Sequence, residues 1–219
     1  MTTRDLPGDH VAPSRPDGRS TRYADHRARL LAGAIEHVLA HGVAGLRLRP
    51  LAAELGVSPA ALLNHFGSKE GLIAEVLQSF RTYSMRVTMK AEGDRSGDPT
   101  LAAYDRWFAR WTDDAVLPGV RLIFECYVLG FRDPGHYGAA LTQTVDDWLA
   151  YLRTYLRSLG CPDDELDDYA SLMFATMTGQ QIDLLASGEH ARIAGGHRRF
   201  VALLEHARTG WRASDAPAS

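Results

Sequence analysis

The stretch from Arg47 to Leu72, RLRPLAAELGVSPAALLNHFGSKEGL, constrains the fold more than any other part of this 219-residue chain. On either side of Gly56, apolar residues recur at the spacing of one helix face. A glycine can adopt the left-handed conformation that ends a helix, so Gly56 and Gly67 each predict a helix end. Ser58 can cap the helix between them, and Pro59 fits its first position because no donor is lost there.

Two short helices joined by a tight glycine turn form a helix-turn-helix, which can place its second helix in the major groove of DNA. The spacing alone fits an ordinary helical hairpin equally well. After the second glycine, Ser68 can cap a third helix, which continues amphipathically through Leu77. The local pattern therefore predicts three helices in succession.

The same stretch resembles the DNA-binding region of the tetracycline-repressor (TetR) family of bacterial transcription regulators. The residues that carry the resemblance are Leu51-Ala52, Leu55-Gly56-Val57-Ser58, His65-Phe66, Lys69-Glu70 and Leu72. It extends over roughly Leu30 to Leu77, and beyond that it rests on length and helical layout. It implies an all-α fold, with an N-terminal three-helix helix-turn-helix domain and a C-terminal helical domain for ligand binding and dimerisation.

Three positions depart from the family pattern. Arg47 stands where the family usually has a phosphate-contacting threonine, and its charge can replace that contact. Ala60 stands at a position that is usually glycine or another small residue. Leu63 replaces a tyrosine and has no polar group, so it either meets a thymine methyl or packs inward.

The resemblance also implies which side chains contact DNA. Arg49 stands where some members of the family read guanine, and its forked donors suit O6 and N7. From the second helix of the motif, Asn64 is the best reader of adenine. The full set of predicted DNA contacts is Arg47, Arg49, Ser58, Pro59, Ala60, Leu63, Asn64, His65 and Lys69.

The charge distribution fits a basic head on an acidic body, although chance would also produce such a difference. Through Lys90 there are 12 basic and 8 acidic residues, and from Ala91 onward there are 12 and 19, which gives the net charge of −3. No apolar run approaches the roughly 20 residues that span a bilayer, and no signal segment opens the chain. We therefore expect a cytoplasmic protein without a membrane partner, with Cys126 and Cys161 reduced and buried.

The composition of the chain and its helix-breaking residues predict a division into four segments. Residues 1–23 are rich in Pro, Gly, Ser, Thr and Asp and are predicted to be a disordered arm, with or without a minor-groove contact. Residues 24–70 form the predicted DNA-binding domain, 71–212 the effector and dimerisation domain, and 213–219 a loose tail. Outside the motif, helices are predicted over 25–41, 69–91, 98–114, 118–132, 137–159, 166–186 and 189–212. A polar loop is predicted at 92–99, and its Asp98 and Pro99 start the next helix. The helix from Lys69 is expected to be the sole link between head and body.

Bulky residues of the second half predict an apolar effector pocket, although each of them alone fits an ordinary helix core. The predicted lining is Trp107, Trp111, Phe124, Tyr127, Phe131, Trp148, Met173 and Met177, with Gln180, Asp146 or Asp147 as polar anchors. The last two helices resemble the family's four-helix dimer interface through Leu172, Phe174, Ala175, Met177, Ile182, Leu185, Phe200, Leu203, Leu204 and Trp211.

The sequence contains no motif for catalysis, phosphate binding or paired-cysteine metal binding. We therefore expect that the protein is not an enzyme and that it binds no cofactor and no metal. His37 and His41 have a metal-compatible spacing but lack a third ligand nearby. We expect a homodimeric repressor that binds a palindromic operator in double-stranded DNA and is released by a small apolar effector. Two alternatives remain open: a DNA-binding regulator without a small-molecule effector, and a helical binding or catalytic protein whose N-terminal hairpin is structural.

Overall fold

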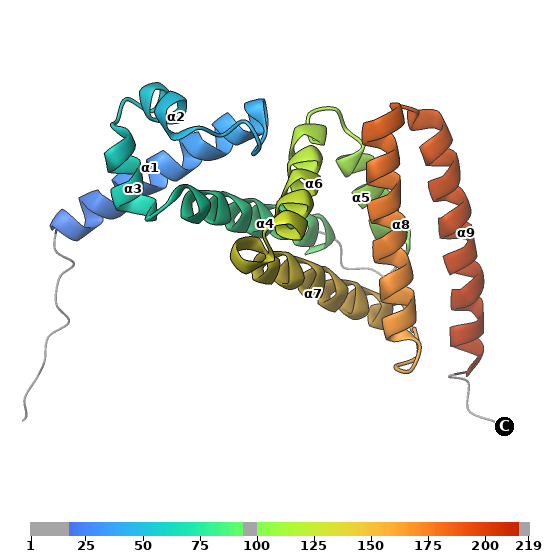
Figure 1. The fold of residues 1–219 in the computed structure, drawn as a ribbon. Helices are drawn as coiled ribbons and strands as arrows, with labels where there is room; N and C mark the ends of the chain where they lie inside the picture. The colour runs from blue at the N-terminus through green and yellow to red at the C-terminus, as the bar shows by residue number, and fades with distance from the viewer. Residues whose placement is uncertain (1–17, 94–99, 215–219) are drawn as a thin grey trace, which may run out of the picture.

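The computed structural model describes residues 18–93 and 100–214, and over these residues the chain is helical throughout, without a strand. The helices, in chain order, are α1 (Gly18–His41), α2 (Leu48–Glu54), α3 (Pro59–Phe66), α4 (Lys69–Gly93), α5 (Ala102–Trp111), α6 (Leu117–Arg132), α7 (Pro134–Ser158), α8 (Leu166–Ser187) and α9 (His190–Ser214). The all-α fold is as predicted. Helices α1–α3 form a head at one end of the molecule, and the antiparallel pair α8 and α9 stands at the other end (Figure 1).

The predicted glycine helix ends and serine caps of the helix-turn-helix are confirmed. Gly56, between α2 and α3, has a φ of +68°, and Gly67 ends α3 with a φ of +75°. The Ser58 hydroxyl accepts a hydrogen bond from the Ala61 N–H at 3.1 Å, which caps α3. Ser68 accepts one from the Gly71 N–H at 2.9 Å at the start of α4. The helix ends between Gly56 and Ser68 are therefore fixed by residues within three positions of them.

Several helix boundaries differ from the sequence-based prediction. Helix α1 begins at Gly18, within the segment predicted as a disordered arm, and residues 1–17 of that arm lie outside the described residues. Helix α4 continues to Gly93, into the predicted loop, of which 94–99 also lie outside them. Helix α7 begins at Pro134 rather than at Tyr137, because proline is tolerated in a first helical turn and the Asp133 side chain accepts the His136 N–H at 3.2 Å. Of the predicted tail, 213 and 214 belong to α9.

Two apolar clusters fill the molecule, and the boundary between them does not coincide with the predicted domain boundary. The head cluster contains the buried faces of α1–α4, and also Leu122 and Cys126 of α6 and Tyr137 of α7. The body cluster is built from α5 to α9. Residues of the second half therefore complete the core of the head.

The prediction that the helix from Lys69 alone joins head and body is wrong. Helix α6 packs directly against α1, and the Glu125 carboxylate accepts a hydrogen bond from the Val43 N–H at 2.5 Å. Sequence adjacency suggested a single connection, whereas the packing supplies a second one. Both cysteines are free and buried, as expected, and burial raises the pKa of Cys126 to about 12. In the described part of the chain, no helix has the length and apolar content needed to cross a membrane.

Candidate nucleic-acid interface and ligand pocket

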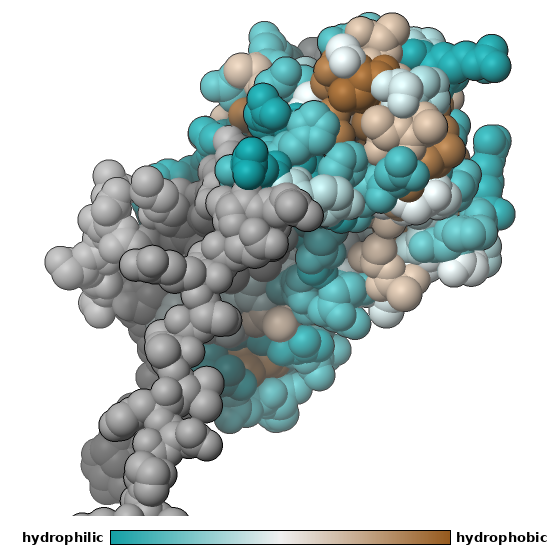
Figure 2. Space-filling view, turned by 90° about the vertical axis from the view of Figure 1, so that its left-hand side faces the viewer, coloured by the Kyte–Doolittle hydropathy of each residue, from teal (hydrophilic) through white to brown (hydrophobic). Residues whose placement is uncertain are grey.

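Helix α3 divides its residues between the core of the head and the solvent. Leu62 and Phe66 are buried, which fixes the rotation of the helix. The opposite side exposes Ala60, Leu63 and Asn64. Leu63 is 38% exposed, so of the two predicted roles the fold leaves open the contact outside the protein rather than inward packing. Seen from the end of the head, the described surface is largely hydrophilic with a small hydrophobic group (Figure 2).

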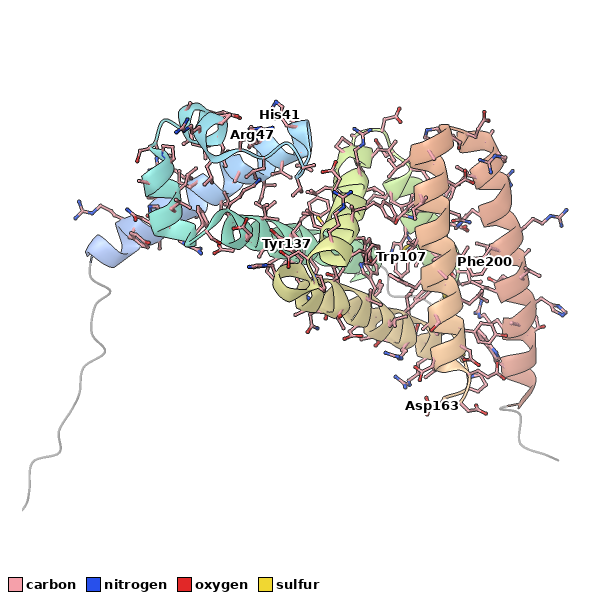
Figure 3. All side chains as sticks on the ribbon, viewed as in Figure 1. His41, Arg47, Trp107, Tyr137, Asp163 and Phe200 are labelled. Carbon is pink, nitrogen blue, oxygen red and sulfur yellow. The ribbon has the colours of Figure 1, made fainter. Side chains whose placement is uncertain are left out.

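Three cationic side chains lie at the starts of α2 and α4, the helices that precede and follow α3. Arg47 occupies the N-cap position of α2, Arg49 lies in its first turn, and Lys69 begins α4. Arg47 and Arg49 are exposed and Lys69 is half-buried. Within the described residues, none of the three side chains takes part in a hydrogen bond or an ion pair. Figure 3 shows Arg47 on the head, well away from Trp107 and Phe200 in the body.

His65 differs from the solvent-facing cation that a phosphate contact would use. Its ring packs against Tyr23 at 4.6 Å and His26 at 5.2 Å between ring centroids, both in α1. Burial lowers the pKa of His65, and the nearby charges of His26 and Arg27 lower it further. A neutral ring that contacts α1 orients α3, and its predicted contact with phosphate stays a prediction.

Arg27 of α1 connects α3 to the neighbouring helices. Its guanidinium forms an ion pair with Glu75 of α4 and lies 5.1 Å from the centre of the Phe66 ring. Its Nε donates to the His65 carbonyl at 3.3 Å. One side chain thus links α1, α3 and α4, and the short α3 is held at a fixed angle on the head.

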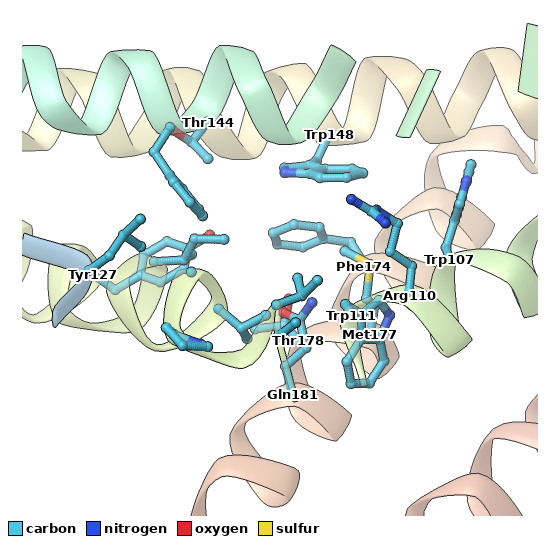
Figure 4. Close-up of a pocket in the computed structure, with 18 of the residues that line it drawn as sticks. Trp107, Arg110, Trp111, Tyr127, Thr144, Trp148, Phe174, Met177, Thr178 and Gln181 are labelled. Carbon is cyan, nitrogen blue, oxygen red and sulfur yellow. The ribbon is translucent and has the colours of Figure 1, made fainter. Parts of the chain in front are cut away.

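A pocket of about 490 Å³ lies between the head and the body. This volume is within the roughly 300–1,000 Å³ range of small-molecule sites. Its wall contains five of the nine residues in the predicted ligand set, namely Trp107, Trp111, Tyr127, Trp148 and Met177 (Figure 4). The rest of the wall comes from α1, α4, α5, α6, α7 and α8, and from Ala115 and Val116 between α5 and α6.

The other four residues of the predicted ligand set do not line this pocket. Met173 is fully buried in the body core and Phe124 packs against that core, while Phe131 is 77% exposed at the end of α6. Gln180 also lies outside the wall, and its neighbour Gln181 takes the place that was predicted for it. A helix turns by 100° per residue, so a shift of one position moves a side chain off the wall.

The two carboxylates that were offered as anchors also lie elsewhere. Asp146 is exposed, and Asp147 pairs with Arg81 of α4 at 2.7 Å. The sequence reasoning missed the polar groups that do line the pocket, which are Ser79, Arg106, Arg110, Thr144, Thr178 and Gln181. It also missed Ile35 and Leu39 of α1, which bring the head itself into the wall. For Arg110, the available signal was its position three residues after the predicted Trp107, a spacing that makes the two neighbours on the surface of α5.

Helices α8 and α9 leave an apolar and small-residue face exposed. On α8 it follows the helical period through Leu172, Ala175, Gly179, Ile182 and Ala186, all exposed. On α9, Leu203 is 68% exposed. Several residues predicted for this face are buried within the protomer instead, or line the pocket: Met177, Phe200, Leu204 and Trp211 are buried, and Phe174 is in the pocket wall.

Comparison with known proteins agrees with this architecture. The family described as bacterial regulatory proteins, tetR family, matches residues 30–76. Over 153 residues the chain is 31% identical to the HTH-type transcriptional regulatory protein RaaS of Mycobacterium tuberculosis; the match covers 69% of this chain and 66% of RaaS, just under two thirds of that relative.

Two solved structures show the same fold. One is a transcriptional regulator from Rhodococcus sp. Rha1, with a TM-score of 0.63 and 23% identity over 74% of this chain and 84% of that one. The other is a TetR-family regulator from Agrobacterium tumefaciens, with a TM-score of 0.66 and 16% identity over 82% of this chain and 97% of that one. With its helix-turn-helix head and helical body, the chain belongs to the TetR family of bacterial regulatory proteins.

Proposed function

We propose that this protein is a homodimeric, ligand-responsive transcriptional repressor that binds a near-palindromic operator and is released from it by a small, largely apolar effector. The observation that carries the proposal is the outward face of α3, which is exposed while its other face is fixed in the core of the head. This is the arrangement a recognition helix needs to enter a major groove.

The charges around α3 support DNA as the partner. Arg47, Arg49 and Lys69 have no partner within the described residues, so their cationic groups are available to phosphates or to guanine. Neutralising phosphates releases counterions, which supplies much of the affinity of such proteins. Asn64, exposed on the same helix as Leu63, can form a bidentate contact with adenine.

The exposed glycines of the last two helices support dimerisation. Gly179 and Gly196 lie inside α8 and α9, where glycine is about 1 kcal/mol less favourable than alanine. A Cβ built at either position would meet no atom within 4 Å of the same protomer. Packing within one chain therefore gives no reason for these glycines, whereas close approach of a second copy does. Leu172 and Ile182, about half exposed on the same face of α8, would be buried by that copy.

The position of the pocket supports release by a ligand. Ile35 and Leu39 of α1 belong to the head, and both line the cavity together with body helices. A ligand that changes the packing between these helices changes the position of the head relative to the dimer axis. Since two heads must lie about 34–36 Å apart to read successive major grooves, such a change lowers the affinity for the operator. The cavity also favours this proposal over a regulator without an effector.

Selection of bound sequences from a pool of random double-stranded DNA tests the proposal. The full-length protein is expected to enrich an inverted repeat whose half-sites lie about one helical turn apart. A variant with Arg49 and Lys69 both replaced by alanine serves as the matched control, because neither side chain forms a hydrogen bond or an ion pair within the described residues. Failure to enrich any sequence would favour a helical binding protein with a structural hairpin. Enrichment of a single half-site would contradict the dimer.

A further inference from the structure

The charged side chains in the wall of the pocket are all positive. Arg106 and Arg110 of α5 both line it, four residues apart on one helix face, and the described lining contains no aspartate or glutamate. Within the described residues neither guanidinium takes part in a hydrogen bond or an ion pair. The body around them is acidic, with 12 basic and 19 acidic residues from Ala91 onward. Arg106 is half-buried and Arg110 is exposed, so both guanidinium groups are open to a ligand bound in the pocket.

The remainder of the wall is mostly apolar and aromatic, and its other polar side chains, Ser79, Thr144, Thr178 and Gln181, are uncharged. In the close-up, Arg110 lies on the side of Trp107 and Trp148, while Tyr127 and Thr144 lie on the opposite side (Figure 4). The Thr144 hydroxyl already donates to the Ala140 carbonyl of its own helix at 2.8 Å. Among the lining residues, positive charge is thus found only at Arg106 and Arg110.

We propose that the pocket binds an amphipathic organic anion, with an apolar body among the aromatic side chains and an acid group on Arg106 and Arg110. This inference rests on the proposed function, because it names the chemical class of the effector. A guanidinium offers two parallel donors that match a carboxylate, and such charge-assisted bonds are stronger than neutral ones. A cationic ligand of similar size would be repelled by both arginines, and a neutral one would leave them without a partner.

Titration of the full-length protein with three probes of equal chain length tests the proposal: decanoate, decan-1-ol and decylammonium. Trp107, Trp111 and Trp148 line the pocket, so tryptophan fluorescence reports occupancy. Decanoate is expected to bind about tenfold or more tightly than decanol, as charge-assisted hydrogen bonds predict, and decylammonium more weakly than either.

Replacement of the arginines separates charge from fold. The double variant Arg106→Gln and Arg110→Gln is expected to lose the preference for decanoate and to bind decanoate and decanol with equal affinity. Arg121→Gln, an exposed arginine of α6 outside the pocket wall, is the matched control and should keep the preference for decanoate. The double variant Arg106→Glu and Arg110→Glu should prefer decylammonium, which no loss of stability would produce.

The proposal is overturned if the unchanged protein binds decanol as tightly as decanoate, if none of the probes binds, or if the double glutamine variant keeps the preference. These outcomes are distinct from failure of the proposed function. The selection of DNA is carried out without any probe, so a protein that enriches an operator but shows no preference for the anion remains a regulator with a different effector.

Discussion

The carboxylate of Glu125 in α6 accepts a hydrogen bond from the backbone N–H of Val43, in the turn that follows α1, at 2.5 Å. The adjacent Gly42 has a φ of +77°, and a Cβ there would lie 2.9 Å from both Glu125 oxygens. Helix α6 thus fixes the turn that follows α1. Position 42 of this turn needs a glycine, because its φ is positive and a Cβ would contact Glu125. The neighbours Ile123 and Tyr127 on the same helix line the pocket, so α6 connects the pocket to the head.

Replacing Glu125 with alanine should destabilise the protein by about 1–3 kcal/mol, because the buried Val43 would keep an N–H without a partner. The change is measured as a lower midpoint of denaturant unfolding. Glu36→Ala on the exposed side of α1 is the control and should stay within about 0.5 kcal/mol of the unchanged protein. Equal midpoints for the two variants would show that the Glu125 contact contributes nothing to stability.

Arg49→Ala tests whether Arg49, in the first turn of α2, contacts the edge of a base in the operator. We expect it to weaken binding to the selected operator by about 1–3 kcal/mol and to relax the sequence preference at one position of each half-site. Fluorescence anisotropy with operators that vary one base pair at a time provides the measurement. An equal loss of affinity on every sequence would instead assign Arg49 to the phosphate backbone.

Lys69→Ala is expected to weaken binding to all sequences to a similar degree, because a lysine at the start of a helix contacts phosphate rather than base edges. The slope of log affinity against log salt should decrease by about 1, as one phosphate contact is lost. Titrations at several salt concentrations, on operator and on unrelated DNA, measure both effects. An unchanged slope together with altered sequence preference would contradict the assignment.

The helix-turn-helix could be predicted almost residue by residue because its signals are local. Ser58 and Ser68 cap helices through backbone groups three residues away, and Gly56 and Gly67 end helices through their own φ. Such effects do not depend on the rest of the fold. The same holds for the buried face of α3, which follows from spacing alone.

The pocket could be predicted only in part, because its wall depends on how six helices rotate against one another. Met173 and Met177 lie four residues apart on α8, yet the first is sealed in the core and the second lines the cavity. The sequence pattern marks both as apolar and cannot choose between them. Arg106 was passed over because a charged residue on an amphipathic helix is usually solvated, and only the packing places it at a cavity.

Stability should fall in mild acid because of His197 in α9. Its ring is buried, stacks on Phe108 at a centroid distance of 3.9 Å, and has Nε2 2.8 Å from an Asp105 oxygen. Burial lowers the pKa of His197 by more than the Asp105 carboxylate raises it. The His197 ring therefore binds a proton more readily in the unfolded chain than in the folded one. The free energy of unfolding should decrease as the pH falls from about 6.5 through the lowered pKa of the folded state.

Thermal unfolding of His197→Gln between pH 8 and pH 5 measures this contribution. The variant should lose part of the dependence on pH, whereas His190→Gln, an exposed histidine in the first turn of the same helix, should retain it. An identical pH dependence in the unchanged protein and in His197→Gln would mean that other groups cause the acid sensitivity.

The outer face of α8 predicts the effect of a charge on assembly. Ile182 is 50% exposed, and it shares that face with Leu172 and Gly179. Ile182→Glu should leave the protomer folded, since the side chain is outside its core, but would place an unpaired carboxylate in a dimer interface. We expect a shift from dimer to monomer in sedimentation velocity and a loss of operator binding, because a single head reads only one half-site.

Phe131→Glu is the matched control. Phe131 is 77% exposed, which is more than Ile182, but it lies at the end of α6. A glutamate at this position should therefore leave the dimer intact. Dissociation by both variants, or by neither, would place the interface elsewhere than on α8.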